Sequence, residues 1–104
     1  MNTQEILSRY AAGQRDFRNI NLIAANLRSV NLSGANLSGA DLRGANLTKA
    51  NLSYVNLTQA TLTGANFTLT NLTSANLSAI DLSNVNLSNA YLNGTIMPSQ
   101  ISST

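Results

Sequence analysis

The chain has 104 residues, a formal net charge of +2, and neither Cys nor His. This length suits one domain, and the lack of Cys excludes a disulfide framework or a thiolate metal site. The lack of His removes the commonest general base and the commonest metal ligand, which disfavours an enzyme.

The first fourteen residues predict a helical cap. Thr3 is a suitable N-cap for a helix over residues 3–12, and Gly13 suits the C′ position because glycine readily adopts a positive φ. The apolar side chains at helical spacing are Ile6, Leu7, Tyr10 and Ala11. We expect residues 1–14 to lie with this apolar face across the start of the segment that follows.

Residues 16–92 repeat a five-residue unit sixteen times without an insertion or deletion. The central position, which we name i, is Leu in fourteen units and Phe in the other two, at Phe17 and Phe67. Position i−2 is Ala in nine units, position i−1 is Asn in eleven, and position i+1 is Ser or Thr in eleven. Such a short fixed period is typical of repeat proteins.

A period of five fits neither an α-helix nor a flat strand. On a helix, successive Leu side chains would step around the axis and form no stripe. On a strand, an odd period would send alternate Leu side chains to opposite faces. All of them point inward only if positions i−2 and i face a common axis and the chain then turns a corner. Repeated corners coil the chain into a solenoid whose stacked coils bury apolar columns.

The units resemble the pentapeptide-repeat family, as Ala-Asn-Leu-Ser-Gly at 35–39 and Ala-Asp-Leu-Arg-Gly at 40–44 illustrate. Residues 7–17 also resemble the N-terminal cap of bacterial, often cyanobacterial, members of the family. The resemblance implies an all-β solenoid, a right-handed quadrilateral β-helix with four units per coil. Residues 15–97 would then form about four coils behind the helical cap, followed by a polar C-terminal tail at 98–104.

Stacking at twenty-residue intervals places like positions of successive coils in columns. At position i−1 we expect the stacked Asn amides to hydrogen-bond to one another along each column. Thr70 occupies an inward position, so its hydroxyl needs a backbone acceptor. The bulkier Ile20 and Ile80 at inward positions are expected to bulge the interior only slightly.

The regular pattern ends after Leu92, and residues 93–98 start a further coil. No second helix is predicted to cap this end, so strand edges and the side chains of Leu92 and Met97 are expected to be exposed. All six basic residues precede position 51, and beyond it the only charged side chain is Asp81. An open edge with little charge repulsion predicts a homodimer through the C-terminal coil.

We predict no catalytic, cofactor-binding or metal-binding residues and no concave site. Asp41 and Asp81 share one column two coils apart, but a convex, solvated face has no means to raise the pKa of either carboxyl group. The candidates for contact with a protein partner are outward apolar side chains, namely Leu69, Tyr91 and Tyr54. Leu69 and Tyr91 are expected to lie near each other on adjacent coils.

The leading functional interpretation is a non-enzymatic structural scaffold or protein-interaction module with an unknown partner. The basic residues are too scattered over the sides of the coils for a phosphate track, so we expect no nucleic acid. The family resemblance implies an alternative, because some members imitate DNA and inhibit gyrase, a type II topoisomerase. This chain departs from those members in having only four acidic residues and a net positive charge.

The sequence also predicts a cytoplasmic protein without a membrane contact. No apolar run approaches the ~20 residues that a membrane-spanning helix needs. The first residues lack the basic and then apolar pattern of a secretory signal.

Overall fold

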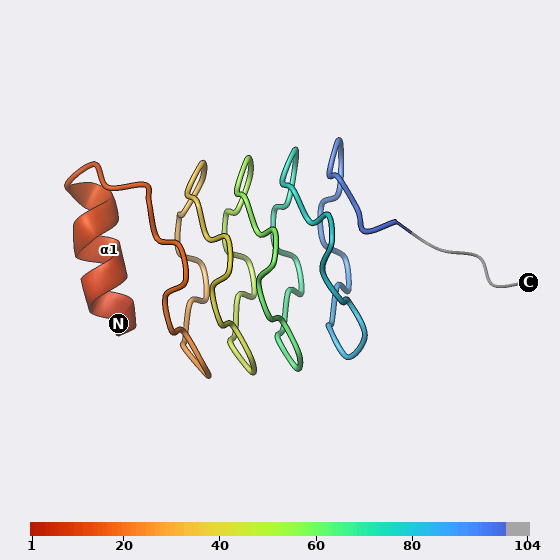
Figure 1. Cartoon of the computed structure of the whole chain (residues 1–104), viewed down its shortest axis with the longest axis horizontal. Coiled ribbons are helices and arrows are strands. Elements are labelled where there is room, and N and C mark those ends of the chain that lie inside the picture. Colours follow the sequence, from red (N-terminus) through yellow and green to blue (C-terminus); the bar gives the residue numbers. More distant parts are fainter. Residues whose placement is uncertain (100–104) are drawn as a thin grey trace, which may run out of the picture.

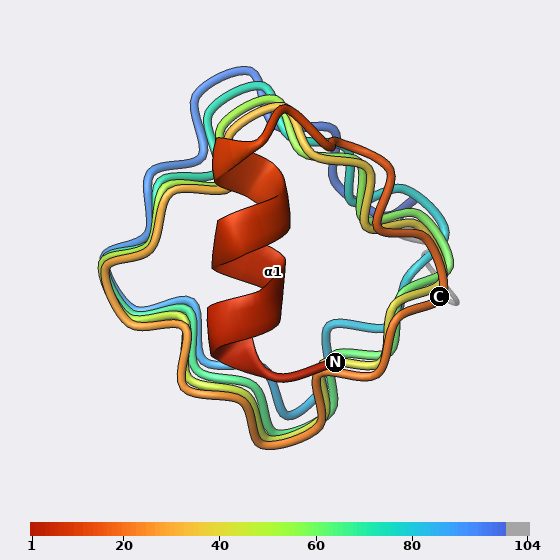
Figure 2. The ribbon, with the colours of Figure 1, turned by 90° about the vertical axis from the view of Figure 1, so that its left-hand side faces the viewer.

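The computed structural model describes residues 1–99, which form helix α1 (Thr3–Ala11) and four stacked coils (Figure 1). Seen along the stack, the coils superpose as a four-sided figure that α1 crosses (Figure 2). The molecule is 24 Å wide in both of its short directions. The stacked coils predicted from the spacing, and the four-sided shape that the family resemblance implied, are therefore confirmed. The polar tail predicted at 98–104 lies largely outside the described residues.

Coils 1 to 4 comprise residues 16–35, 36–55, 56–75 and 76–95. We number the sides by their inward residues at position i: side 1 has Phe17, Leu37, Leu57 and Leu77; side 2 has Leu22, Leu42, Leu62 and Leu82; side 3 has Leu27, Leu47, Phe67 and Leu87; side 4 has Leu32, Leu52, Leu72 and Leu92. Parallel bridges of one residue pair join positions twenty apart, and residues 1–99 contain no longer β-strand. The last bridge, between Asn76 and Ile96, places Ile96 at the start of a fifth coil.

The corners of the coils are β-turns. At all sixteen corners the residue at i+2 has a positive φ, and five of these residues are Gly whereas eleven are not. In most corners the C=O of position i also accepts a hydrogen bond from the N–H three residues later, as in a type II turn. A side chain held in this left-handed region costs about 1–2 kcal/mol, so hydrogen bonds between coils must hold most corners in place.

The length of the turn hydrogen bond at each corner varies with the side chain of its donor residue, which is position i−2 of the following unit. Where this residue is Ala, the turn hydrogen bond is 2.9–3.1 Å long, and where it is Val, the bond is 3.2–3.3 Å long. At Ile20 and Ile80 the turn bond is absent. A larger side chain beneath the corner therefore overpacks it and pushes the turn open.

Backbone pairing between coils 3 and 4 is also interrupted at the corner that contains Ile80. Thr61 and Asp81 are not among the bridged pairs, and the N–H of Gly64 donates to the C=O of Asn84, one residue beyond the equivalent partner on the other coils. The light-blue segment near residue 80 accordingly leaves the path that the other coils share (Figure 2). The expectation that Ile80 would disturb the interior only slightly is wrong.

The Asn side chains at position i−1 cap their own corners. Fourteen Asn or Asp residues at this position accept a hydrogen bond from the backbone N–H two residues later, as Asn46 does from Thr48 at 3.0 Å. The exceptions are Thr61 and Tyr91. The predicted bonds between stacked amides are wrong, since none joins two Asn side chains in residues 1–99. The local Asx turn already uses the amide oxygen that such a ladder would need.

The Asx caps predict a specific pair of mutational effects. Asn46→Ala removes the acceptor for the N–H of Thr48 and is expected to lower the free energy of unfolding by about 1 kcal/mol. Asn46→Asp keeps an acceptor oxygen, as Asp41 does naturally at the same position, and is expected to cost less than half as much. Urea unfolding followed by far-UV circular dichroism measures both. Equal losses for the two variants would contradict the capping role.

Helix α1 forms as the sequence predicted, with a different N-cap. The Asn2 side chain accepts a hydrogen bond from the N–H of Glu5 at 2.8 Å, so Asn2 and not Thr3 is the N-cap. Thr3 instead donates to a carbonyl of coil 1. At the other end, Gly13 has a φ of 103°, and bonds from Gly13 to Tyr10 and from Gln14 to Arg9 form a Schellman motif.

The cap covers both the core and the edge of coil 1 (Figure 2). Ile6 is fully buried and Leu7 and Tyr10 pack against the core, whereas Ala11 is exposed, contrary to its predicted place on the apolar face. Three side chains of the cap segment donate to carbonyl oxygens of coil 1: Thr3 to Asn26 at 3.1 Å, Tyr10 to Ser33 at 2.7 Å, and Gln14 to Asp16 at 2.8 Å. The free backbone edge of the first coil is thus occupied by its own cap.

Candidate interaction surface

Leu69 and Tyr91 lie on adjacent coils and are separated by two residues in the register between them. The N–H of Tyr91 donates to the C=O of Thr70 at 2.9 Å, and its own C=O accepts from the N–H of Leu72 at 2.9 Å. Tyr91 is therefore bridged to Asn71, the second residue after Leu69 in the coil before. The Tyr91 side chain is 55% exposed, and Leu69 is half-buried. We name these two residues, which lie near the corner where side 3 turns into side 4, the Leu69–Tyr91 surface.

Tyr54 lies apart from this pair. It occupies the corner after Leu52, where side 4 ends, and its N–H donates to the C=O of Thr73. Its side chain is 67% exposed, the largest value among the exposed large hydrophobic residues in the described part of the chain. The structure therefore brings two of the three predicted contact residues together and leaves the third at the other end of the same side.

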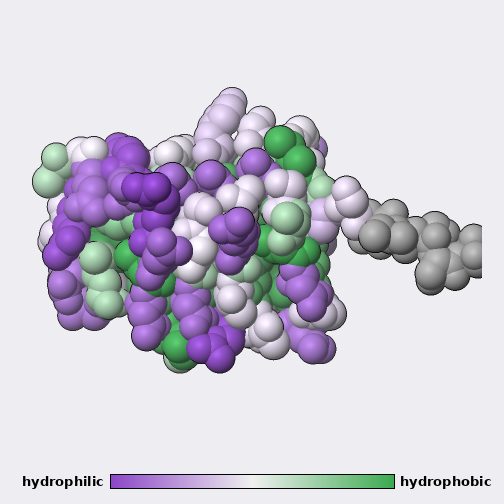
Figure 3. Space-filling model, viewed as in Figure 1, coloured by the Kyte–Doolittle hydropathy of each residue, from purple (hydrophilic) through white to green (hydrophobic). Residues whose placement is uncertain are grey.

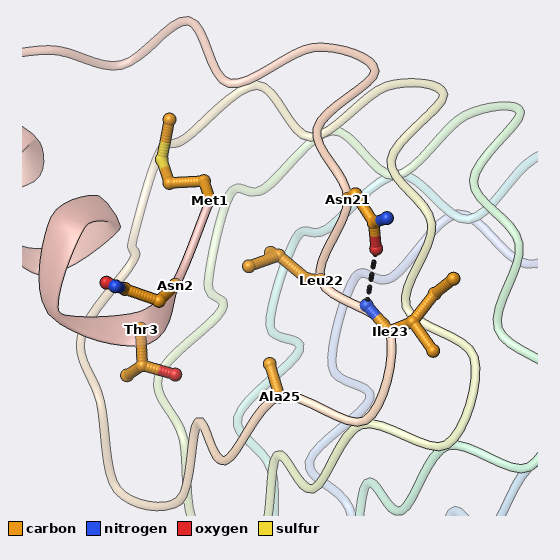
Figure 4. Close-up of a pocket in the computed structure, with 7 residues that line it drawn as sticks. All are labelled: Met1, Asn2, Thr3, Asn21, Leu22, Ile23 and Ala25. Atoms are coloured by element: carbon orange, nitrogen blue, oxygen red, sulfur yellow. Dashed lines mark hydrogen bonds between the residues drawn. The ribbon is translucent and has the colours of Figure 1, made fainter.

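An open hollow of about 400 Å³ lies between the start of α1 and side 2 of coil 1 (Figure 4). The residues that line it are Met1, Asn2, Thr3, Asn21, Leu22, Ile23 and Ala25. None of these side chains is titratable, and the side-chain amide oxygen of Asn21 accepts a hydrogen bond from the N–H of Ile23. The expectation of no concave site is wrong here, because the sequence did not show how the start of α1 would overhang the coil.

Two ion pairs, each within a single repeat, involve four of the ten charged side chains. Asp16 and Arg18 form an ion pair at 2.9 Å, and Asp41 and Arg43 form one at 2.6 Å. The hydrogen bonds from the arginines lower the pKa of each of these carboxyl groups. Asp81, whose pKa is also lowered, accepts hydrogen bonds from Ser83. All three carboxylates thus remain ionised at neutral pH.

The C-terminal end exposes part of its core. Leu92 is 37% and Met97 39% exposed, as expected from the sequence, and Ile96 is 53% exposed. Green, hydrophobic surface appears at this end of the stack, whereas purple, hydrophilic surface dominates the opposite end (Figure 3). Four further apolar residues of coil 4 are only partly buried, namely Leu82, Val85, Leu87 and Ala90.

The exposure of Ile96 was not predicted, because this residue follows the last regular repeat. Among residues 1–99, no group of three or more Asp or Glu side chains could hold a metal ion. Within the same range, no helix combines the length and the apolar character that crossing a bilayer requires.

Comparisons with known proteins place the chain in a family. The family model described as "Pentapeptide repeats (8 copies)" matches residues 16–53 and 50–89. A comparison with curated proteins gave no match. Among solved structures, alr5209, a pentapeptide repeat protein from Nostoc Pcc 7120, is similar with a TM-score of 0.86 and 34% identity, over 97% of this chain and 88% of that one.

A second solved structure is HetL from the cyanobacterium Nostoc sp. strain PCC 7120, a pentapeptide repeat protein involved in heterocyst differentiation regulation. Its TM-score is 0.60 and its identity 38%, over 91% of this chain but only 46% of HetL. The repeat units, the stacked four-sided coils and these two likenesses agree. This chain belongs to the pentapeptide-repeat family and has its right-handed quadrilateral β-helix.

Proposed function

We propose that this protein is a non-enzymatic cytoplasmic scaffold that binds a protein partner through the Leu69–Tyr91 surface. The observation that carries the proposal is the bridge between Asn71 and Tyr91, which places an exposed aromatic residue within two residues of the half-buried Leu69 in the register of adjacent coils. Protein interfaces are enriched in Tyr and centred on a few apolar anchors. Asp81, on side 2, is the only charged side chain after Lys49, so a partner meets little charge to desolvate here.

The stack supports this role because it presents its surface rigidly. On side 4, parallel bridges join Asn31 to Asn51, Asn51 to Asn71 and Asn71 to Tyr91. Each coil is thus fixed by its neighbours, as in other solenoids. A surface that is already ordered loses little conformational entropy on binding.

The chemistry of the described side chains favours binding over catalysis. A general acid that works at neutral pH needs a raised carboxyl pKa, whereas the pKa of Asp16, Asp41 and Asp81 is lowered. The hollow beside α1 is lined by Asn, Thr, Met and aliphatic side chains. These groups can bind a side chain or a small ligand but offer no acid or base.

The alternative derived from the sequence, DNA mimicry directed at gyrase, has weaker support. A DNA mimic needs rows of free carboxylates, and two of the four acidic residues, Asp16 and Asp41, are already paired with arginine. A gyrase supercoiling assay decides this point. Inhibition at a stoichiometric ratio, retained in a Tyr91→Ser variant, would favour mimicry over the scaffold proposal.

Affinity capture tests the scaffold proposal. Immobilised protein is expected to retain a partner from a cyanobacterial lysate, and Leu69→Asp or Tyr91→Ser is expected to abolish that retention. The matched control is Ile23→Asp, which changes an exposed apolar side chain on coil 1 and is expected to leave retention intact. A partner that all three variants retain equally would show that the Leu69–Tyr91 surface is not the binding site.

A further inference from the structure

We infer that Asn93 is a site of spontaneous covalent modification, at which the backbone nitrogen of Gly94 attacks the side-chain amide and converts Asn93 to aspartate or isoaspartate. The inference follows from the residue pair itself, the unpaired N–H of Gly94 and the exposed side chain of Asn93. It does not depend on the proposed function.

The pair Asn93–Gly94 is unique in this chain. Asn93 is the only Asn that Gly follows, whereas eleven of the sixteen Asn residues are followed by Leu or Phe. The reaction requires the nitrogen of the next residue to reach Cγ of the Asn side chain. Gly leaves this approach open because it has no Cβ, so the sequence favours the reaction at Asn93 over every other Asn.

The N–H of Gly94 lies at the end of a ladder of corner hydrogen bonds on side 4. Three N–H groups of this ladder donate to a C=O of the following coil at 2.9 Å: those of Gly34, Tyr54 and Ser74. The N–H of Gly94 ends the ladder and has no partner within residues 1–99. Its nitrogen can therefore attack without first breaking a hydrogen bond.

The side chain of Asn93 is also available. It is exposed and forms no hydrogen bond to any group in residues 1–99. The Asn side chains at position i−1 are instead bonded to their own corners, as Asn71 is to the N–H of Thr73 at 3.0 Å. Cγ of Asn93 can turn towards the nitrogen of Gly94 without the loss of such a bond.

The corner that contains the pair is held on one side only. The N–H of Ser74 binds the C=O of Asn93 at 2.9 Å, and the turn bond from Thr95 to Leu92 is 3.2 Å long. This turn bond is longer than those of the corners closed by Ala. A corner with few backbone contacts distorts more readily, and the attack of nitrogen on Cγ requires such a distortion.

Asn19 provides a comparison within the same chain. The N–H of Ile20 also has no hydrogen bond to a group in residues 1–99. Ile20 is β-branched, however, and its stiff side chain obstructs the approach of its own nitrogen to the Asn side chain. Asn19 thus has an unpaired following N–H without Gly, and only Asn93 combines the two.

The reaction uses only solvent water as a co-reactant. The nitrogen of Gly94 loses its proton and bonds to Cγ of Asn93, the Cγ–Nδ2 bond breaks, and ammonia leaves. Water then opens the resulting succinimide at either of its carbonyl carbons and gives aspartate or isoaspartate. Both products carry a carboxylate that is ionised at neutral pH, in a half of the chain whose only charged side chain is Asp81.

The isoaspartate product has a further effect, because its side-chain carbon atoms become part of the main chain. Beyond the corner, the hydroxyl of Thr95 donates to the C=O of Leu72 at 2.6 Å, and the N–H of Ile96 donates to the C=O of Ala75 at 2.9 Å. A longer main chain moves both donors out of register. Isoaspartate therefore releases the start of the fifth coil, whereas aspartate only adds charge.

Incubation of the full chain, followed by peptic digestion at acidic pH and mass spectrometry, tests the inference. Chromatography separates the Asn, aspartate and isoaspartate forms of each peptide. Asn93 is expected to convert at least about tenfold faster than Asn19, and Gly94→Ala is expected to slow conversion by about tenfold. Ala24 and Ala79 occupy the equivalent corner position with a positive φ, so this variant is expected to keep its far-UV circular dichroism spectrum.

A second Asn–Gly pair isolates the role of the unpaired N–H. Thr63→Asn places an Asn before Gly64, whose N–H donates to the C=O of Asn84 at 2.9 Å. Conversion at position 63 is expected to be about tenfold slower than at position 93, because the hydrogen bond must break first. Equal rates at the two positions would overturn the inference, and so would conversion of Asn93 no faster than that of Asn19.

Amide hydrogen exchange tests the effect on the fifth coil. Exchange at Ile96 is expected to be faster in the isoaspartate form than in the unconverted chain, while exchange at Leu57 stays unchanged. Asn93→Asp is the control, because it adds the charge without lengthening the main chain. Equal exchange at Ile96 in the isoaspartate form and in this variant would show that the longer main chain does not release the coil.

Discussion

Leu47→Ala is expected to lower the free energy of unfolding by about 3 kcal/mol, whereas Leu87→Ala is expected to cost about half as much. The two residues occupy the same column on side 3. Leu47 is fully buried between coils 1 and 3, so its loss leaves a closed cavity. Leu87 is covered from one side only, and water can fill part of the space that its truncation leaves.

Denaturant unfolding measures both losses, at a submicromolar protein concentration that disfavours the homodimer predicted from the sequence. Ser88→Ala, at an exposed side chain on coil 4, serves as the control and should change the free energy of unfolding by less than about 0.5 kcal/mol. Equal losses at Leu47 and Leu87 would mean that something covers the last coil in the monomer. That result would also remove the exposed apolar end on which the homodimer predicted from the sequence depends.

The core was predictable from the sequence because burial imposes a strict condition on a five-residue period. Leucines five apart can share one interior only if the chain turns between them, so the stack follows from the spacing alone. A buried hydroxyl group must likewise find a hydrogen-bond acceptor. Thr70 donates to the C=O of Leu47 at 2.6 Å, as the sequence predicted.

The details of the corners were less predictable because competing local arrangements have similar energies. An Asn amide can bond along a column or to the backbone two residues later, and the pattern of Asn followed by Ser or Thr does not decide between them. Asn2 and Thr3 are likewise both good N-caps. The loss of backbone pairing near Ile80 depends on how much space lies inside one corner. The positions of apolar residues in the sequence do not give that space.

The candidate surface could be predicted only in part, for a different reason. The backbone register that sets Tyr91 beside Leu69 follows from the twenty-residue stacking, and the sequence could therefore place the two residues near each other. The half-burial of Leu69 and the hollow under Met1 depend on side-chain packing and on the path of α1. A repeat fold serves many functions, so the repeat pattern does not identify the binding partner.

Ile6→Asp is expected to lower the free energy of unfolding by about 3 kcal/mol or more, because a charged carboxylate cannot replace a fully buried Ile without a partner. The variant can keep the charge in water only if α1 leaves coil 1. Its departure exposes the inward side chains of Phe17, Leu22, Leu27 and Leu32 and frees the carbonyl of Asn26. The first coil would then have an open end as well.

Gln4→Asp provides the matched control, because it places the same charge on the exposed face of α1. Near the positive end of the helix it should change the free energy of unfolding by less than about 0.5 kcal/mol. Hydrogen exchange identifies the cause: Ile6→Asp should speed exchange in coil 1 first and in coil 3 least, since each coil is held by its neighbours. Uniform acceleration through all four coils would show instead that the stack unfolds as one unit and that α1 does not protect its first coil specifically.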